Sequence, residues 1–181
     1  KKINENYSFE HPIVFVEGDF LKNDLPSNSF DFVIGKAFLH HLTIPVEGLF
    51  LKETARLLKP DGEARFFEPA VNNKILDEIR WHIPVSGRPS KFYKEAFSKW
   101  KEEDPHPDRR FSSRHWERAG KEYFEEVKII PVGTLERFSR LFKWGKKQGE
   151  FKRWALEKEK YLPGFLKLSF ARGQLIIYKK P

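Results

Sequence analysis

The chain has 181 residues and a mass of 21.5 kDa, enough for one domain with its own hydrophobic core and hardly enough for two. Hydrophobic residues make up 39% of it and charged residues 33%, which excludes a disordered or fibrous protein. The chain has no cysteine, so disulfides, thiolate metal sites and cysteine nucleophiles are excluded. Its six histidines are scattered, and we expect no metal site.

The net charge of +8 is concentrated in the second part of the chain. Residues 1–70 hold 8 Lys and Arg against 11 Asp and Glu, whereas residues 71–181 hold 26 against 15. This asymmetry indicates either an anionic partner for residues 71–181, such as nucleic acid, membrane headgroups or an acidic small molecule, or a lysine-rich solvated surface.

No stretch approaches the ~20 apolar residues that a membrane-spanning helix needs, and the first residues lack the apolar core of a secretory signal. The sequence therefore predicts a cytoplasmic protein. It contains no methionine, which predicts that it is a fragment or an incomplete record.

The first part of the chain alternates strand and helix patterns. The continuous apolar run Ile13–Val16 predicts a buried strand, Phe30–Ile34 a second buried strand, and Ala64–Phe67 a third strand. An amphipathic helix is predicted from Pro45 to about residue 58, and it stops at the turn Lys59-Pro60-Asp61-Gly62. Strand, helix and strand at this spacing predict a βαβ unit in a parallel sheet.

The second part is less regular. Two good strands, Val127–Val132 and Gln174–Lys179, flank a basic, aromatic and helical insertion. Further helices are predicted over Asn73–Ile83, weakly around Tyr93–Trp100, and from Ser112 or Ser113 to about Phe124. We interpret residues 1–181 as a single domain in which 71–126 forms a substrate or lid region and 135–162 forms the insertion.

Six short motifs occur in order across about fifty residues. They are Glu17-Gly18-Asp19, Leu25-Pro26, Asn28 to Ile34, Leu39-His40-His41-Leu42, Leu57 to Gly62 and Phe67-Glu68-Pro69. Together they resemble the later motifs of the class I S-adenosylmethionine-dependent methyltransferases, and within that family they are most similar to the small-molecule and quinone type. The resemblance is specific over residues 13–69 and looser over 106–181.

The resemblance implies an α/β, Rossmann-like fold with a mostly parallel sheet, an antiparallel last strand and helices on both faces. The family's strand order is 3-2-1-4-5-7-6, so two strands would separate Ile13–Val16 from Phe30–Ile34. The glycine-rich turn after the family's first strand and the acidic residue after its second have no counterpart in the chain. Because an isolated strand is not stable in water, we expect roughly 60 to 90 further residues upstream in the natural protein.

The same resemblance implies a cofactor site for S-adenosylmethionine, which leaves as S-adenosylhomocysteine. Asp19 would accept a hydrogen bond from the adenine amine, and Phe20 would lie against the adenine ring. Lys36, Ala37 and Phe38 would run beside the sulfonium and amino-acid part, at the carboxyl edge of the sheet. The alternative for Asp19 is a helix cap.

Two residues are candidates for the chemistry, each with a structural alternative. His40 could take a proton from an attacking hydroxyl, or it could pack the loop before the next helix, as His41 could. Glu68 could orient or deprotonate the substrate, or it could hold the turn before Pro69. Methyl transfer needs mainly positioning and exclusion of water, so no fixed triad is expected.

Acceptor choice is expected in Arg80-Trp81-His82, Arg88, the Phe92–Trp100 aromatics, His106 and residues 135–162. The leading function is methyl transfer to a small hydrophobic or acidic acceptor, such as a quinone precursor or a lipid-like molecule. Residues 135–162 could also contact a membrane surface. The alternatives are an RNA or tRNA methyltransferase, for which no RNA-binding module is visible, and a non-catalytic methyltransferase-like scaffold.

Overall fold

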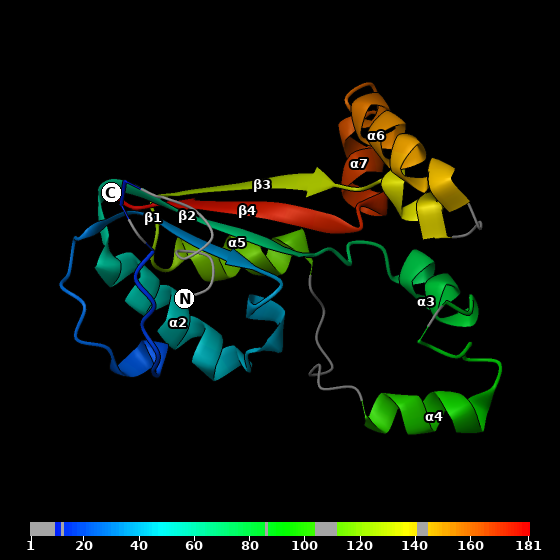
Figure 1. Cartoon of the computed structure of the whole chain (residues 1–181), viewed down its shortest axis with the longest axis horizontal. Coiled ribbons are helices and arrows are strands. Elements are labelled where there is room, and N and C mark those ends of the chain that lie inside the picture. Colours follow the sequence, from blue (N-terminus) through cyan, green and yellow to red (C-terminus); the bar gives the residue numbers. More distant parts are fainter. Residues whose placement is uncertain (1–9, 12, 86, 104–111, 141–144) are drawn as a thin grey trace.

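The structure is a computed structural model that describes residues 10–11, 13–85, 87–103, 112–140 and 145–181. The expectation for His106 lies outside the described residues, as does the part of the insertion between 141 and 144. Figure 1 shows one sheet on the left, with helices below it and further helices beyond its right-hand edge.

Four strands form the sheet: β1 (Phe30–Lys36), β2 (Leu58–Pro69), β3 (Glu126–Val132) and β4 (Gly173–Lys179). Their order is β1-β2-β4-β3. Strand β1 pairs with β2 in parallel, and β4 is antiparallel to both of its neighbours. This confirms the predicted α/β sheet with an antiparallel last strand.

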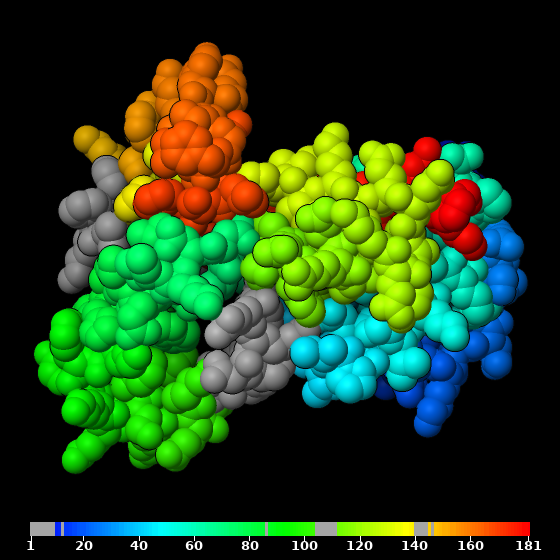
Figure 2. All heavy atoms as spheres, turned by 180° about the vertical axis from the view of Figure 1, so that it is seen from behind, coloured from blue at the N-terminus to red at the C-terminus, as the bar shows by residue number. Residues whose placement is uncertain are grey.

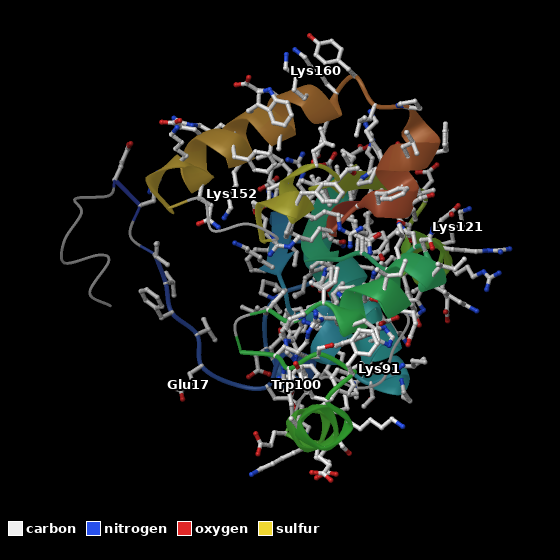
Figure 3. All side chains as sticks on the ribbon, turned by 90° about the vertical axis from the view of Figure 1, so that its right-hand side faces the viewer. Glu17, Lys91, Trp100, Lys121, Lys152 and Lys160 are labelled. Carbon is white, nitrogen blue, oxygen red and sulfur yellow. The ribbon has the colours of Figure 1, made fainter. Side chains whose placement is uncertain are left out.

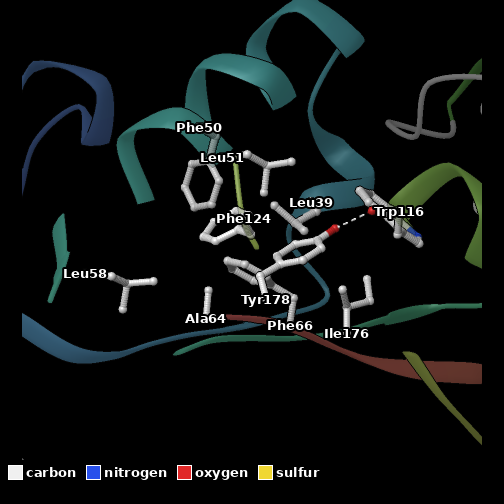
Figure 4. Close-up of a cluster of buried hydrophobic side chains, with 10 residues drawn as sticks. All are labelled: Leu39, Phe50, Leu51, Leu58, Ala64, Phe66, Trp116, Phe124, Ile176 and Tyr178. Carbon is white, nitrogen blue, oxygen red and sulfur yellow. Dashed lines mark hydrogen bonds between the residues drawn. The ribbon is translucent and has the colours of Figure 1, made fainter. Parts of the chain in front are cut away.

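Two helices, α2 (Ile44–Leu57) and α5 (Ser113–Lys121), pack on one face of the sheet (Figure 1). Ser112 caps α5 as predicted, because its hydroxyl accepts a hydrogen bond from the His115 N–H. Side chains from both helices and from strands β2 and β4 meet in one core, drawn in Figure 4. Its members are Leu39, Phe50, Leu51, Leu58, Ala64, Phe66, Trp116, Phe124, Ile176 and Tyr178.

Tyr178 lies at the centre of this core. Its hydroxyl donates to the Trp116 carbonyl at 2.9 Å, the dashed line in Figure 4, and its ring stacks on Phe124 with centroids 4.9 Å apart. Burial raises the pKa of the Tyr178 hydroxyl, so the group stays neutral and keeps donating. The core is therefore tied to α5 by a directional contact as well as by apolar area.

The predicted turn at Lys59–Gly62 becomes an irregular stretch within β2. Phe30 pairs with Leu58 and Phe32 with Glu63, so the register shifts there. Asp61 takes a left-handed conformation with φ of 60°. A Cβ on Gly62 would come within 2.9 Å of the Lys59 carbonyl oxygen, so only glycine fits this position without a shift.

The remaining helices gather beyond the edge where β1, β2 and β3 end (Figure 1). Helices α3 and α4 follow β2, and they match the predicted Asn73–Ile83 and Tyr93–Trp100 within a few residues. Helix α7 was not predicted, since its seven residues are too few for a clear periodicity. The elements are α3 (Lys74–His82), α4 (Lys94–Glu102), η3 (Glu136–Arg140), η4 (Gly145–Lys147), α6 (Gln148–Glu159) and α7 (Gly164–Phe170).

The predicted buried strand at Ile13–Val16 is wrong. These residues form no strand, and their side chains are exposed, Val14 by 83%. Figure 3 shows the segment around Glu17 running apart from the rest of the ribbon. A strand needs a hydrogen-bonded neighbour, and within the described residues the sheet ends at β1.

The face of β1 opposite α2 is open. Phe32 is 53% exposed and Ile34 is 77% exposed there. Helices on both faces were expected, but over β1 the described helices cover one face only. No helix in the described part of the chain is long and apolar enough to cross a membrane.

Candidate functional site

The predicted site residues lie where β1 and β2 end side by side. Because the two strands are parallel, the chain leaves both at the same edge of the sheet. After β1 it passes through Ala37 and Phe38 into the short helix η2 (Leu39–His41). Strand β2 ends with Glu68 and Pro69.

Glu68 fixes the loop that follows β1. Its side chain is fully buried, and Oε1 accepts hydrogen bonds from the N–H groups of Phe38 (3.0 Å) and Leu39 (2.9 Å). Its Oε2 lies 2.6 Å from Nδ1 of His40 and accepts a longer bond, 3.4 Å, from the His40 N–H. A buried carboxylate is tolerated when its oxygens are satisfied in this way. The geometry favours the structural alternative for Glu68, with the loop rather than the turn before Pro69 as the element held.

The two histidines differ in their surroundings. His40 is 5% exposed and bonded to Glu68, whereas His41 is exposed and packs its ring on that of His40 at 4.1 Å. An ionised carboxylate only accepts hydrogen bonds, so the proton of the His40–Glu68 contact belongs on Nδ1. The structure therefore brings the two predicted catalytic residues together, but within the loop rather than facing an open cavity.

The chain turns sharply between β1 and η2. Ala37 has φ of 51°, a left-handed conformation that is uncommon for a residue other than glycine, and its N–H donates to the Phe67 carbonyl at 2.8 Å. The turn leaves Lys36, Ala37 and Phe38 exposed at the edge. The N–H groups of Ala37 and Phe38 are used within the protein, so these residues would meet a ligand there through their exposed surface.

The structure places Asp19 and Phe20 next to this loop through a shared ring. Phe20 and Phe38 both pack on Phe50, with ring centroids 4.4 and 5.0 Å away. Asp19 is exposed and caps the short helix η1 (Phe20–Lys22), because its Oδ1 accepts from the Leu21 N–H at 3.0 Å. Its Oδ2 makes no hydrogen bond within the described residues.

These residues fit the adenine end of S-adenosylmethionine. A solvent-facing carboxylate oxygen suits the exocyclic amine, and aromatic rings beside it suit a flat base. The helix-cap alternative for Asp19 is observed, but it uses only one of the two oxygens, so the two roles are compatible.

A second feature is a pocket of about 240 Å³ between α3, η3 and α7. Figure 2 shows α7, in orange-red, directly against the green residues of α3. Ala70 contributes from the chain just after β2, and its N–H donates to the Arg172 carbonyl at 3.0 Å. The pocket therefore opens at the same edge of the sheet as the loop held by Glu68.

Four arginines and an apolar wall line this pocket, and no carboxylate lines it among the described residues. Sequence analysis singled out Arg80 and Arg88, included Arg137 only within the range 135–162, and missed Arg172. Only the surplus of positive charge after residue 70 indicated Arg172. The apolar wall is Leu76, Ile79, Ile83, Val85, Phe138 and Phe170.

The aromatic residues expected to choose the acceptor mostly contact one another. Trp81 packs against Phe97 and Trp100, with centroids 5.6 and 5.9 Å apart, and thereby joins α3 to α4. The guanidinium groups of Arg80 and Arg88 lie over the Trp81 ring. This is the core of a small helical unit, the plainer of the two interpretations of these aromatics.

A second buried carboxylate, missed by sequence analysis, supports the far side of the pocket. Glu159 of α6 is 7% exposed and accepts hydrogen bonds from the N–H groups of Gly133 (3.0 Å) and Leu135 (2.7 Å). It fixes the chain between β3 and η3, as Glu68 fixes the chain between β1 and η2. No cluster able to hold a metal ion lies within the described ranges.

Comparison with known proteins gives one family match, over the first part of the chain, and several solved structures of similar fold. Residues 1–66 match the model of the methyltransferase domain family. No curated protein matches the chain. A solved S-adenosylmethionine-dependent methyltransferase from Archaeoglobus fulgidus superposes with a TM-score of 0.54 and 19% identity, over 91% of this chain and 66% of that one.

Two further structures agree on the fold. A putative methyltransferase from Bacillus halodurans C-125 gives a TM-score of 0.52 at 17% identity, over 99% of this chain and 76% of that one. Geranyl diphosphate C-methyltransferase from Streptomyces coelicolor A3(2), in complex with Mg²⁺, geranyl diphosphate and S-adenosylhomocysteine, gives 0.50 at 12% identity, over 91% and 52%. The chain thus spans between about half and three quarters of these structures.

Together the family match over residues 1–66 and the shared topology show that this chain has the fold of the class I S-adenosylmethionine-dependent methyltransferases. The observed strand order β1-β2-β4-β3 corresponds to 4-5-7-6 of the order expected from the resemblance.

Proposed function

We propose that this protein transfers the methyl group of S-adenosylmethionine to a small hydrophobic or acidic acceptor, such as a quinone precursor or a lipid-like molecule. The observation that carries the proposal is the set of groups gathered at the edge of the sheet where β1 and β2 end. A carboxylate and aromatic rings suited to adenine lie there beside a loop fixed by Glu68, and an arginine-lined pocket opens just beyond β2.

The cofactor, when bound, supplies a sulfonium whose methyl group is already reactive. Oδ2 of Asp19 accepts a hydrogen bond from the adenine amine, and Phe20 and Phe38 form the apolar side of the adenine site. The exposed loop formed by Lys36, Ala37 and Phe38 orients the sulfonium end. These residues bind and position the cofactor rather than react.

Glu68 and His40 act as positioning residues in this proposal. Both are buried and satisfied by the loop between β1 and η2, so neither is placed to exchange a proton with a bound acceptor. Rate enhancement then comes from in-line alignment and exclusion of water. Contact of α6 with a membrane surface stays a prediction, consistent with Trp154 and Leu156 being about half exposed there.

Replacing Asp19 by Ala is expected to weaken binding of S-adenosylmethionine by the natural full-length protein about tenfold or more, since a charge-assisted hydrogen bond to the adenine is lost. The measurement is calorimetric titration with S-adenosylmethionine and S-adenosylhomocysteine. Asp24→Ala is the matched control, because it removes an exposed carboxylate five residues further on.

Micromolar binding that falls in Asp19→Ala and persists in Asp24→Ala supports the site. Absence of binding to the natural protein would overturn the enzymatic function and favour a non-catalytic scaffold. Equal binding by both variants would remove Asp19 from the cofactor site.

A further inference from the structure

The pocket between α3, η3 and α7 concentrates positive charge in an apolar setting. Arg80, Arg88, Arg137 and Arg172 all line it. Two of them have carboxylate partners outside the lining, Arg80 with Asp77 at 2.7 Å and Arg172 with Glu136 at 2.7 Å. Within the described residues, the guanidinium groups of Arg80, Arg137 and Arg172 thus share the space with two neutralising carboxylates.

The other two arginines are held by backbone carbonyls. Arg137 donates from Nη1 to the Phe170 carbonyl at 2.8 Å, and within the described residues it has no carboxylate at ion-pair distance. Arg88 donates from Nη2 to the carbonyls of Arg80 and Ile83, both at 2.7 Å. These bonds fix the direction of both side chains at the pocket, and the carbonyl bonded to Arg137 does not cancel the charge of its guanidinium.

The charge of Arg137 is destabilised in the structure as it stands. Burial, together with the positive charges of Arg80 and Arg172, lowers the pKa of the Arg137 guanidinium. The Nε–H of Arg80 is also buried and has no acceptor within the described residues. An anion in the pocket would relieve both costs.

The apolar wall restricts what kind of anion fits. Aliphatic side chains of α3 and the rings of Phe138 and Phe170 form the rest of the lining. A free inorganic ion would leave the apolar side chains of this wall exposed to water. A polymer backbone would not enter a cavity of about 240 Å³. That volume is below the ~300–1,000 Å³ of sites for drug-sized ligands, so the ligand is small.

We propose that this pocket binds an amphiphilic anion, with a carboxylate or phosphate head among Arg80, Arg137 and Arg172 and a short apolar body against α3 and Phe138. Guanidinium groups suit both head groups, because their planar donors match two anionic oxygens at once. The inference rests on the proposed function in one respect: the bound anion is taken to be the methyl acceptor, because the pocket opens beyond the same strand that carries Glu68.

The test is calorimetric titration without S-adenosylmethionine, using octanoate and octyl phosphate as probes and 1-octanol, octylammonium and inorganic phosphate as controls. We expect at least one of the two anionic amphiphiles to bind at least tenfold more tightly than every control. The stronger of the two identifies a carboxylate or a phosphate as the preferred head. Equal binding of octanol would overturn the proposal, and so would tight binding of phosphate alone.

Variants locate the site. Arg137→Gln and Arg80→Gln are each expected to weaken binding of the anionic probe about tenfold, whereas Arg118→Gln, on the exposed side of α5, is expected to leave it unchanged. Arg80 is partly exposed, so its variant keeps the test valid if Arg137→Gln does not fold. Unchanged binding in Arg80→Gln and in any folded Arg137→Gln would overturn the proposal.

Two further outcomes separate the alternatives. Binding of single-stranded RNA that is lost in the arginine variants, with no binding of either amphiphile, would contradict the proposal and favour a nucleic acid at this surface. The probes bind without cofactor. Absence of probe binding would therefore overturn the anion proposal and would not affect the result of the S-adenosylmethionine titration. Failure of that titration with intact probe binding would overturn the proposed function instead.

Discussion

Glu68→Gln is expected to weaken S-adenosylmethionine binding by at least tenfold and to lower the free energy of unfolding by about 3 kcal/mol. The buried carboxylate accepts hydrogen bonds from the N–H groups of Phe38 and Leu39 and from Nδ1 of His40. An amide keeps one acceptor and replaces the other with a donor. The amide NH₂ then faces either the backbone N–H groups or Nδ1–H of His40, and two donors cannot hydrogen-bond to each other. The loop between β1 and η2 therefore loses its position.

The matched control is Glu159→Gln, which removes the other buried loop-holding carboxylate. It is expected to cost about as much stability, because Glu159 also accepts from buried N–H groups. It should leave cofactor affinity unchanged, since its loop belongs to the arginine-lined pocket. Chemical unfolding and calorimetry on both variants measure the two effects separately. Equal losses of cofactor affinity in both would show a general loss of structure instead of a specific role of Glu68.

Gly120→Ala is expected to lower the free energy of unfolding by about 3 kcal/mol. A Cβ at this position would lie 2.1 Å from Cε1 of Tyr178. The ring cannot move aside freely, because its hydroxyl is bonded to the Trp116 carbonyl and its face is stacked on Phe124. Chemical unfolding of the variant checks the value.

Gly149→Ala in α6 is the control for this change. Nothing lies within 4 Å of the added Cβ there, so the higher helix propensity of alanine should raise stability by about 0.5 to 1 kcal/mol. Destabilisation of Gly149→Ala to the same degree, or a Gly120→Ala protein as stable as the parent, would contradict the packing described for the core.

The strands and most helices could be predicted because their signals are local. Apolar runs between turn residues located β1, β3 and β4, and Asn73 and Ser112 cap α3 and α5 through their own side chains. Order and direction of the strands came from the resemblance. The segment Ile13–Val16 has the apolar pattern of a strand, but a strand depends on neighbours that a local pattern does not report.

The site was less predictable because its contacts join distant residues. Glu68 was placed at the right edge of the sheet, but its bonds to the loop 28 to 30 residues earlier are tertiary. Arg137 and Arg172 reach one pocket with Arg80 only once η3 and α7 pack beside α3. Sequence analysis could give the positive sign of the net charge in this half of the chain. It could not show that these arginines line one pocket.

The most direct test of the account is ultraviolet crosslinking of S-[methyl-³H]adenosylmethionine to the natural protein, followed by trypsin digestion. Asp19 and Phe20 lie in the peptide 3–22, and Ala37, Phe38 and Phe50 lie in the peptide 37–52. Within residues 1–181, the account predicts label in these two peptides, and its loss when excess S-adenosylhomocysteine is present. Label confined to other peptides, or label that S-adenosylhomocysteine does not displace, would contradict the placement of the cofactor at the edge formed by β1 and β2.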